Sequence, residues 1–170
     1  MRSITVVVKM CFTIVVFILL CSANARESEQ MTEKQFILRP IGSVHIEKGH
    51  TTLVLNKKFG PALHGLDGFS HVWVFWWFDR NDTPKKRSIL QVHPIGNKKN
   101  PLTGVFACRS PARPNLIALT LCRVLSVKDN IVEIDKIDAF ANTPILDLKP
   151  YIPSYDYAKA SVPDWRDNRK

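Results

Sequence analysis

The sequence lacks most of the short motifs by which enzymes are identified. It has no G-x-G-x-x-G segment, so a Rossmann-type nucleotide site has no support. It has no C-x-x-C or H-E-x-x-H spacing, and its 5 histidines show no ligand spacing, which argues against a metal site. The segment Gly68–Val72 has only one glycine of a nucleophile elbow and leads into a strand. The catalytic residue therefore stays unknown, and His45 and His50 are predicted to be surface residues.

Cysteine is scarce, with 4 residues in the chain. Cys11 and Cys21 belong to an apolar N-terminal segment, which leaves Cys108 and Cys122. Both lie in apolar segments, where a free cysteine behaves as a small hydrophobic residue. We therefore favour two buried thiols, with a Cys108–Cys122 disulfide as the alternative in an oxidising compartment.

The only long apolar run is at the N-terminus. Two basic residues precede the run Cys11–Leu20, and Ala23-Asn-Ala25 follows it as an A-x-A pattern. This layout is typical of a secretory signal peptide, and the run is too short for an ordinary membrane span. We expect a signal segment at 1–25, a polar linker at 26–37 and a secreted or periplasmic protein without a stable membrane anchor. The alternative is translation from Met31, which would leave the protein in the cytoplasm.

Acidic residues are few, 15 against 24 basic ones, and the net charge is +9. A basic excess attracts polyanions such as RNA through phosphate neutralisation. Three small clusters in expected loops contribute to it: Lys57 and Lys58; Lys85, Lys86 and Arg87; Lys98 and Lys99. A solvated surface is the alternative interpretation of these clusters.

Helical periodicity is also hard to find, whereas short β-rich runs recur. The expected strands are 41–46, 51–55, 71–78, 90–93, 105–108, 117–127, 131–137 and 145–148. The run His71–Phe78 is apolar on both faces, so it should be central and covered on each side. Asp129-Asn130 is a plausible hairpin turn. The pattern indicates an all-β barrel or sandwich at 38–153, followed by a polar tail at 154–170 that Trp165 could anchor.

The segment Gly104–Thr120, GVFACRSPARPNLIALT, places Arg109 and Arg113 close to prolines. Proline disfavours helix at the residue before it and lacks an amide proton, so a stiff, extended loop is expected. Arg109 could fork onto a carboxylate or phosphate, and Asn115 could read an adenine edge. Asp79, just after the aromatic strand, could hold an ammonium group or a ribose hydroxyl. The alternative for both arginines is a surface salt bridge or a loop brace.

Five blocks in order resemble the TsaA-like, or TrmO-type, methyltransferases. They are LRPIG at 38–42, GLDGFSH at 65–71, VHPIGN at 92–97, NPLTGVFACRSPARPN at 100–115 and TPILDLKPYIP at 143–153. The resemblance implies a single small β-barrel, S-adenosyl-L-methionine as cofactor, tRNA as partner and a homodimer. It also implies methylation of N6 of the modified adenine that follows the tRNA anticodon, at position 37.

The resemblance also suggests site residues. Its cofactor contacts would fall at Asp79, Arg80, Arg109, Leu119, Ala141, Asn142, Thr143 and Pro144. Further motif or substrate candidates are Arg113, Pro114, Asn115, Asp147, Lys149 and Tyr151.

Three departures from the family pattern bear on activity. Arg113–Ala118 reads RPNLIA where RPNPIG is common, and Ala141–Pro144 reads ANTP where DGTP is common. The usual PRQ element is missing around 59–64. Ala141 deletes a carboxylate, whereas Asn142 still tolerates a left-handed backbone. Two alternatives to the methyltransferase follow: an exported, redirected or inactive member that binds an adenosine-containing ligand, and a basic β-barrel that binds RNA.

Overall fold

The structure is a computed structural model that describes residues 35–167. The expected signal segment 1–25, the linker up to residue 34 and residues 168–170 lie outside the described residues. The described residues from Arg39 onward belong to one compact unit. No helix within 35–167 is both long enough and apolar enough to cross a bilayer.

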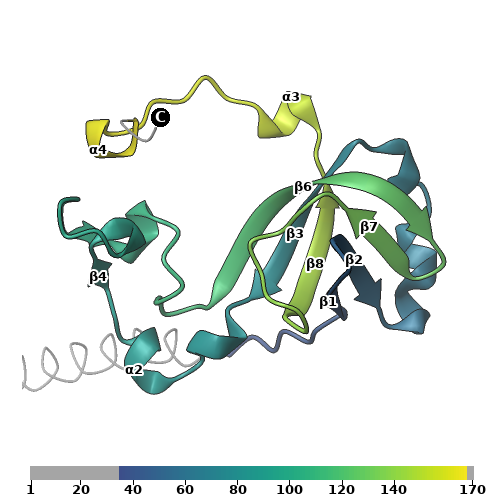
Figure 1. Cartoon of the computed structure of the whole chain (residues 1–170), viewed down its shortest axis with the longest axis horizontal. Coiled ribbons are helices and arrows are strands. Elements are labelled where there is room, and N and C mark those ends of the chain that lie inside the picture. The colour runs from purple at the N-terminus through teal and green to yellow at the C-terminus, as the bar shows by residue number, and fades with distance from the viewer. Residues whose placement is uncertain (1–34, 168–170) are drawn as a thin grey trace, which may run out of the picture. The chain divides into compact units, whose positions relative to one another are not determined.

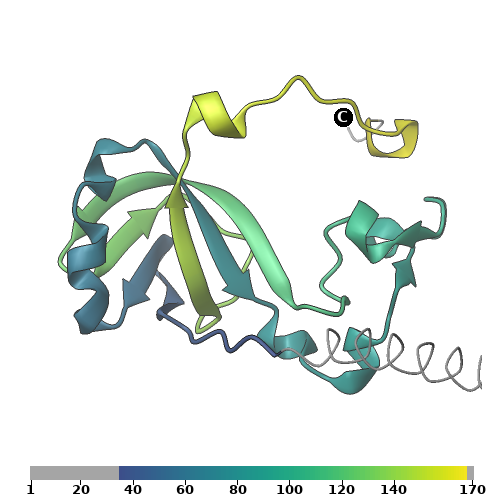
Figure 2. The ribbon, with the colours of Figure 1, turned by 180° about the vertical axis from the view of Figure 1, so that it is seen from behind.

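The predicted β-barrel is confirmed. Its strands close in the order β1-β2-β7-β6-β3-β8, and every neighbouring pair is antiparallel (Figures 1 and 2). The barrel closes where Gly42 pairs with Ile145 and Ser43 with Pro144. The barrel strands are β1 (Gly42–Glu47), β2 (His50–Leu55), β3 (His71–Trp77), β6 (Ile117–Lys128), β7 (Ile131–Ile134) and β8 (Pro144–Pro150).

β3 lies between β6 and β8, as its apolar sequence predicts. Val72, Val74 and Trp76 point inward and are buried, and the Trp76 indole donates a hydrogen bond of 3.1 Å to Thr120 Oγ1. The alternating residues Trp73, Phe75 and Trp77 are only half-buried on the outer face. The expectation that both faces are covered was therefore wrong for the outer face, because a barrel strand has a packed interior on one side only.

β6 pairs with two neighbouring strands along its length. Its first half pairs with β3 and its second half with β7, and the register shifts between Val124 and Ser126. A bulge bends a strand and increases its twist, and β6 curves strongly across the barrel in Figure 1. The expected turn at Asp129-Asn130 is confirmed, since it joins β6 to β7 with Asp129 at φ 55°.

Residues 78–116 connect β3 to β6 and hold a second, two-stranded sheet. β4 (Gln91–Val92) pairs there with β5 (Thr103–Gly104). The predicted strand 105–108 is wrong, because 105–107 form the 3-10 helix η5. Val105 alone is buried in that turn, and the proline-rich segment that follows cannot extend a ladder.

The other helical segments are short. The 3-10 helices are η1 (Lys57–Leu63), η2 (Leu66–Gly68), η3 (Asp79–Asn81) and η4 (Pro94–Gly96). The α-helical turns are α2 (Pro84–Arg87), α3 (Pro153–Asp156) and α4 (Asp164–Asp167). Trp165, the expected anchor of the tail, is half-buried in α4, and His45 and His50 are exposed as predicted.

Both cysteines of the described region are free, as favoured from the sequence. Cys122 lies in the barrel core, and its burial, with a smaller effect of Asp135, raises the pKa of its thiol to about 12. Cys108 is only half-buried and donates a weak hydrogen bond of 3.8 Å to the Val105 carbonyl. The expectation of two buried thiols is thus confirmed for Cys122 and wrong for Cys108.

Candidate functional site

The end of β3 meets the start of β8. Because the two strands are antiparallel and Trp76 pairs with Ile145, residues just after β3 lie beside residues just before β8. The Thr143 hydroxyl donates a 3.5 Å hydrogen bond to Asp79 Oδ1, and Thr143 is only 1% exposed. The Arg80 guanidinium carbon lies 3.8 Å from the centroid of the Phe140 ring. The pair Asp79-Arg80 and the loop 140–144, far apart in sequence, therefore form one cluster.

The loop at Ala141–Pro144 is a tight turn. The Thr143 amide donates to the Phe140 carbonyl at 3.2 Å, and Asn142 between them has φ 68°. A positive φ at the third residue is what a type II turn requires, and asparagine tolerates it better than most residues. The Asn142 amide and the Thr143 carbonyl also bond to the Val44 backbone, at 2.7 and 3.0 Å. The expectation that Asn142 preserves the turn is confirmed, while Ala141 adds no polar group to it.

The arginine-bearing loop carries one anchored arginine and one exposed arginine. Arg113 is half-buried and donates through Nη2 to the Val105 carbonyl at 3.3 Å, so it braces the loop. Arg109 and Asn115 are exposed. Within the part of the chain that the structure describes, neither side chain takes part in a hydrogen bond or ion pair. Both are thus available to a ligand.

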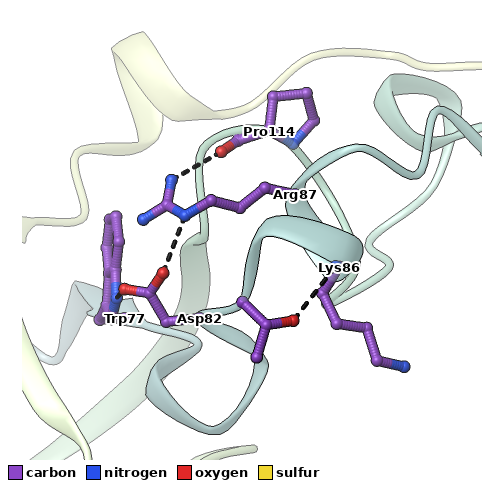
Figure 3. A network of polar contacts seen from close by, with 6 residues as sticks. Trp77, Asp82, Lys86, Arg87 and Pro114 are labelled. Atoms are coloured by element: carbon purple, nitrogen blue, oxygen red, sulfur yellow. Dashed lines mark hydrogen bonds and ion pairs between the residues drawn. The ribbon is translucent and has the colours of Figure 1, made fainter.

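A second polar network joins this loop to the segment after β3 (Figure 3). Arg87 donates through Nε to Asp82 Oδ1 at 2.8 Å and through Nη1 to the Pro114 carbonyl at 2.9 Å. The Trp77 indole donates to the other oxygen of Asp82 at 3.2 Å. The Arg87 hydrogen bond, then the Trp77 hydrogen bond, lower the pKa of Asp82 below its ordinary value, so the carboxylate stays ionised at neutral pH.

Sequence reasoning missed Phe140, Trp77 and Asp82, and treated Arg87 only as part of a basic cluster. Asp82 precedes the helix start at Thr83-Pro84, and Arg87 is the last residue of α2; Thr83 Oγ1 accepts the Lys86 amide at 3.2 Å. A threonine cap followed by proline is a readable signal for a helical turn. No local pattern indicates that Arg87 reaches Pro114.

The remaining candidates lie on the outer face of β3, β6 and β8. Leu119 and Asp147 both pair with Phe75, one from each neighbouring strand. Lys149 forms an exposed ion pair of 3.1 Å with Asp147. The Tyr151 ring contacts Trp73 and His71, with centroids 6.2 and 6.3 Å away.

The candidates thus fall into three groups. Asp79, Arg80 and the turn 141–144 form the first, the 109–115 loop forms the second, and the outer-face residues form the third. In residues 35–167 no hydrogen bond, ion pair or ring contact joins the first group to Arg109 or Asn115.

Comparison with known protein families shows which family the chain belongs to. Residues 29–157 match the family described as the tRNA-methyltransferase O N-terminal domain. The chain belongs to this family. The match covers all three groups of candidate residues, from the pair after β3 to Tyr151 in the segment after β8.

Several named proteins are similar to the chain in sequence. A probable S-adenosyl-L-methionine-binding protein of Methanocaldococcus jannaschii is 42% identical over 124 residues, which are 73% of this chain and 98% of that protein. The tRNA (adenine(37)-N6)-methyltransferase of Rattus norvegicus is 42% identical over 95 residues, 56% of this chain and 21% of that protein.

A solved member has the same fold. The crystal structure of TrmO from Pseudomonas aeruginosa matches with a TM-score of 0.58 at 27% identity, over 75% of this chain and 61% of that one. The chain therefore spans nearly the whole archaeal relative, less than two thirds of the solved bacterial chain and about a fifth of the rat protein.

Proposed function

We propose that this chain is an S-adenosyl-L-methionine-dependent methyltransferase, and that its acceptor is N6 of adenine 37 in tRNA. The observation that carries the proposal is the cluster in which the Asp79-Arg80 pair meets the 140–144 turn. The archaeal relative named for S-adenosyl-L-methionine binding and the rat relative named as a tRNA (adenine(37)-N6)-methyltransferase support it.

The side chains present fit such a cofactor. It carries an ammonium group, ribose hydroxyls, a carboxylate and an adenine ring. Asp79 offers a carboxylate to the ammonium group or a hydroxyl, and Arg109 offers an exposed guanidinium to the carboxylate. Asn115 offers both a donor and an acceptor to an adenine edge.

When bound, the cofactor supplies a sulfonium methyl group. Transfer of that group needs mainly alignment and exclusion of water, so the protein need not present a catalytic dyad. The residues of this chain would orient the donor through Asp79 and the backbone of the 141–144 turn. Ala141 contributes no carboxylate there, so any proton leaving the acceptor must pass to another group.

The basic clusters would attract tRNA. Lys57 and Lys58 lie in η1, Lys85 and Lys86 in α2, and Lys98 and Lys99 between η4 and β5, all exposed. Exposed lysines can neutralise phosphates, which makes binding salt-dependent but carries no sequence information.

We also propose a homodimer. The outer face of β3 and β6 presents Trp73, Phe75 and Trp77 beside Ile117 and Leu121, which are 37% and 39% exposed. A contiguous apolar face of this kind is a usual feature of an interface. Sedimentation of the purified protein would measure its mass, and a monomer at micromolar concentration would contradict the proposal.

Calorimetry with S-adenosyl-L-methionine tests the cofactor. We expect Arg109→Ala to weaken binding by about 1.5 to 3 kcal/mol, because it removes a charge-assisted hydrogen bond. Arg123→Ala, which removes an exposed arginine on β6, is the matched control and should leave affinity unchanged. No binding by the wild type at millimolar ligand would overturn the cofactor assignment.

A second candidate function follows from Ala141. Without the usual aspartate, the chain could bind an adenosine-containing ligand in an exported compartment without methylating tRNA. Mass analysis of tRNA from a deletion strain separates the two functions. Loss of the methyl group on the modified adenine supports the methyltransferase, whereas unchanged methylation with intact ligand binding supports the redirected member. Binding of RNA without any cofactor affinity would indicate the third alternative, a basic RNA-binding barrel.

A further inference from the structure

The segment 78–116 leaves the barrel at the end of β3 and returns at the start of β6. In the described structure, two hydrogen bonds join residues 78–87 to residues 114–116. The Phe78 amide donates to the Leu116 carbonyl at 2.8 Å, next to the register pair Trp77–Ile117. The second is the bond from Arg87 to the Pro114 carbonyl at 2.9 Å. The first continues the barrel ladder, whereas the second depends entirely on one side chain.

Arg87 makes contacts that a planar guanidinium can make together. Its Nε bonds Asp82, its Nη1 bonds Pro114, and its Cζ lies 5.3 Å from the centroid of the Trp77 ring. Asp82 is in turn held by the Trp77 indole, so both carboxylate oxygens are used. A lysine carries one compact ammonium group, which lacks the flat fork that serves two acceptors while packing against a ring.

Pro114 lies between Arg113 and Asn115, two residues that are candidates for ligand binding. It has no amide proton, so its carbonyl is the only backbone group through which it can be held. Arg113 on one side is braced by a longer bond of 3.3 Å to Val105, and Asn115 on the other side is exposed. The orientation of Asn115 is therefore set by its neighbours Pro114 and Leu116, both of which are tied to the segment after β3.

We propose that Arg87, held in place by Asp82 and Trp77, is a positioning residue that fixes the Arg113-Pro114-Asn115 loop for ligand binding. The assignment rests on the proposed function, because it gives Asn115 and its loop a ligand to meet. Arg87 acts through the Pro114 carbonyl and does not itself touch the ligand.

The electrostatics of the network suit a positioning role better than a stabilising one. The Arg87 and Asp82 side chains are 36% and 42% exposed, and exposed ion pairs contribute little to folding stability. Loss of Arg87 should therefore loosen the loop while leaving the barrel folded.

Hydrogen exchange measured by mass spectrometry tests, without any ligand, whether Arg87 orders the Arg113-Pro114-Asn115 loop. In Arg87→Lys and Arg87→Ala, we expect faster exchange in peptides covering 112–117 and unchanged exchange in peptides covering β7. Lys86→Ala is the matched control, because it removes the same charge from the same helical turn. The Lys86 backbone amide bonds to Thr83 Oγ1, outside the network of Arg87, and Figure 3 shows the Lys86 side chain pointing away from Arg87.

Binding and turnover then test the function. We expect both Arg87 variants to lose about 10-fold or more in cofactor affinity or in methyl transfer, since small misplacements of a site are costly. Lys86→Ala should lose cofactor affinity by less than about 2-fold, within the range of an exposed surface substitution. Because Lys86 belongs to a basic cluster proposed to attract tRNA, Arg123→Ala is the control for methyl transfer. Asp82→Ala combined with Arg87→Ala should be no worse than Arg87→Ala alone, because the two residues act as one unit.

The outcomes separate the two proposals. Unchanged exchange at 112–117 in the Arg87 variants overturns the assignment, and so does faster exchange with unchanged binding and turnover. Equal losses of cofactor affinity in Lys86→Ala and Arg87→Ala also overturn it, because charge alone would then explain the effect. A wild type that neither binds the cofactor nor transfers a methyl group overturns the proposed function, while the exchange data still decide whether Arg87 orders the loop.

Discussion

Gly42 shows what the Leu38–Gly42 motif contributes at the scale of single residues. A Cβ built on Gly42 would collide with the Val54 carbonyl and come within 2.6 Å of Leu55 Cα. Both are backbone atoms of β2, which cannot move without breaking the ladder between β1 and β2. The motif glycine is therefore required by the close approach of two strands, at the point where β1 also pairs with β8.

We expect Gly42→Ala to lower the free energy of unfolding by about 1 to 3 kcal/mol, the usual cost of overpacking. Chemical denaturation would measure the change. Gly68→Ala is the control, because a Cβ at Gly68 meets nothing within 4 Å. A Gly42→Ala protein as stable as the control would contradict the steric argument.

At the scale of elements, the turn before β8 illustrates how a sequence departure can preserve a shape. The usual glycine is replaced by Asn142, which takes the left-handed conformation at φ 68°. The turn keeps its Phe140–Thr143 hydrogen bond and its contacts with Val44, so Thr143 still lies against Asp79. Shape is retained, while the carboxylate of the usual aspartate is not.

We expect Asn142→Ala to lower the free energy of unfolding by about 1 to 2 kcal/mol, the cost of a left-handed backbone for an ordinary residue. Asn142→Gly should fall within about 0.5 kcal/mol of the wild type, since glycine adopts this conformation readily. Thermal unfolding of the pair provides the comparison. Equal losses in both variants would show that the asparagine side chain, rather than its backbone, stabilises the turn.

For the whole molecule, compartment and function constrain each other. The segment 1–25 is typical of a secretory signal, whereas one relative is named as a tRNA (adenine(37)-N6)-methyltransferase, and an exported protein would not meet tRNA in the cytoplasm. The net charge of +9 favours a polyanionic partner but does not distinguish RNA from other polyanions.

We expect the native protein to begin at Arg26, after cleavage of the Ala23-Asn-Ala25 pattern. N-terminal sequencing of protein from its natural source would measure this. A start at Met31 would contradict export and leave cytoplasmic tRNA accessible, whereas a start at Arg26 would favour the redirected member.

The sequence by itself determined the barrel strands and the turn at Asp129-Asn130, because residue alternation and turn chemistry are local properties. It was wrong for 105–108, where an apolar run forms a 3-10 turn, and for the outer face of β3. It also identified the family through blocks of residues.

Only the tertiary structure brought Asp79 to Thr143 and Arg87 to Pro114. Those contacts depend on which strands become neighbours and in which register. Closure of the barrel fixes that choice through pairings between residues far apart in the chain. No local pattern encodes such pairings, so the positions of the site residues relative to one another could not be predicted from their spacing.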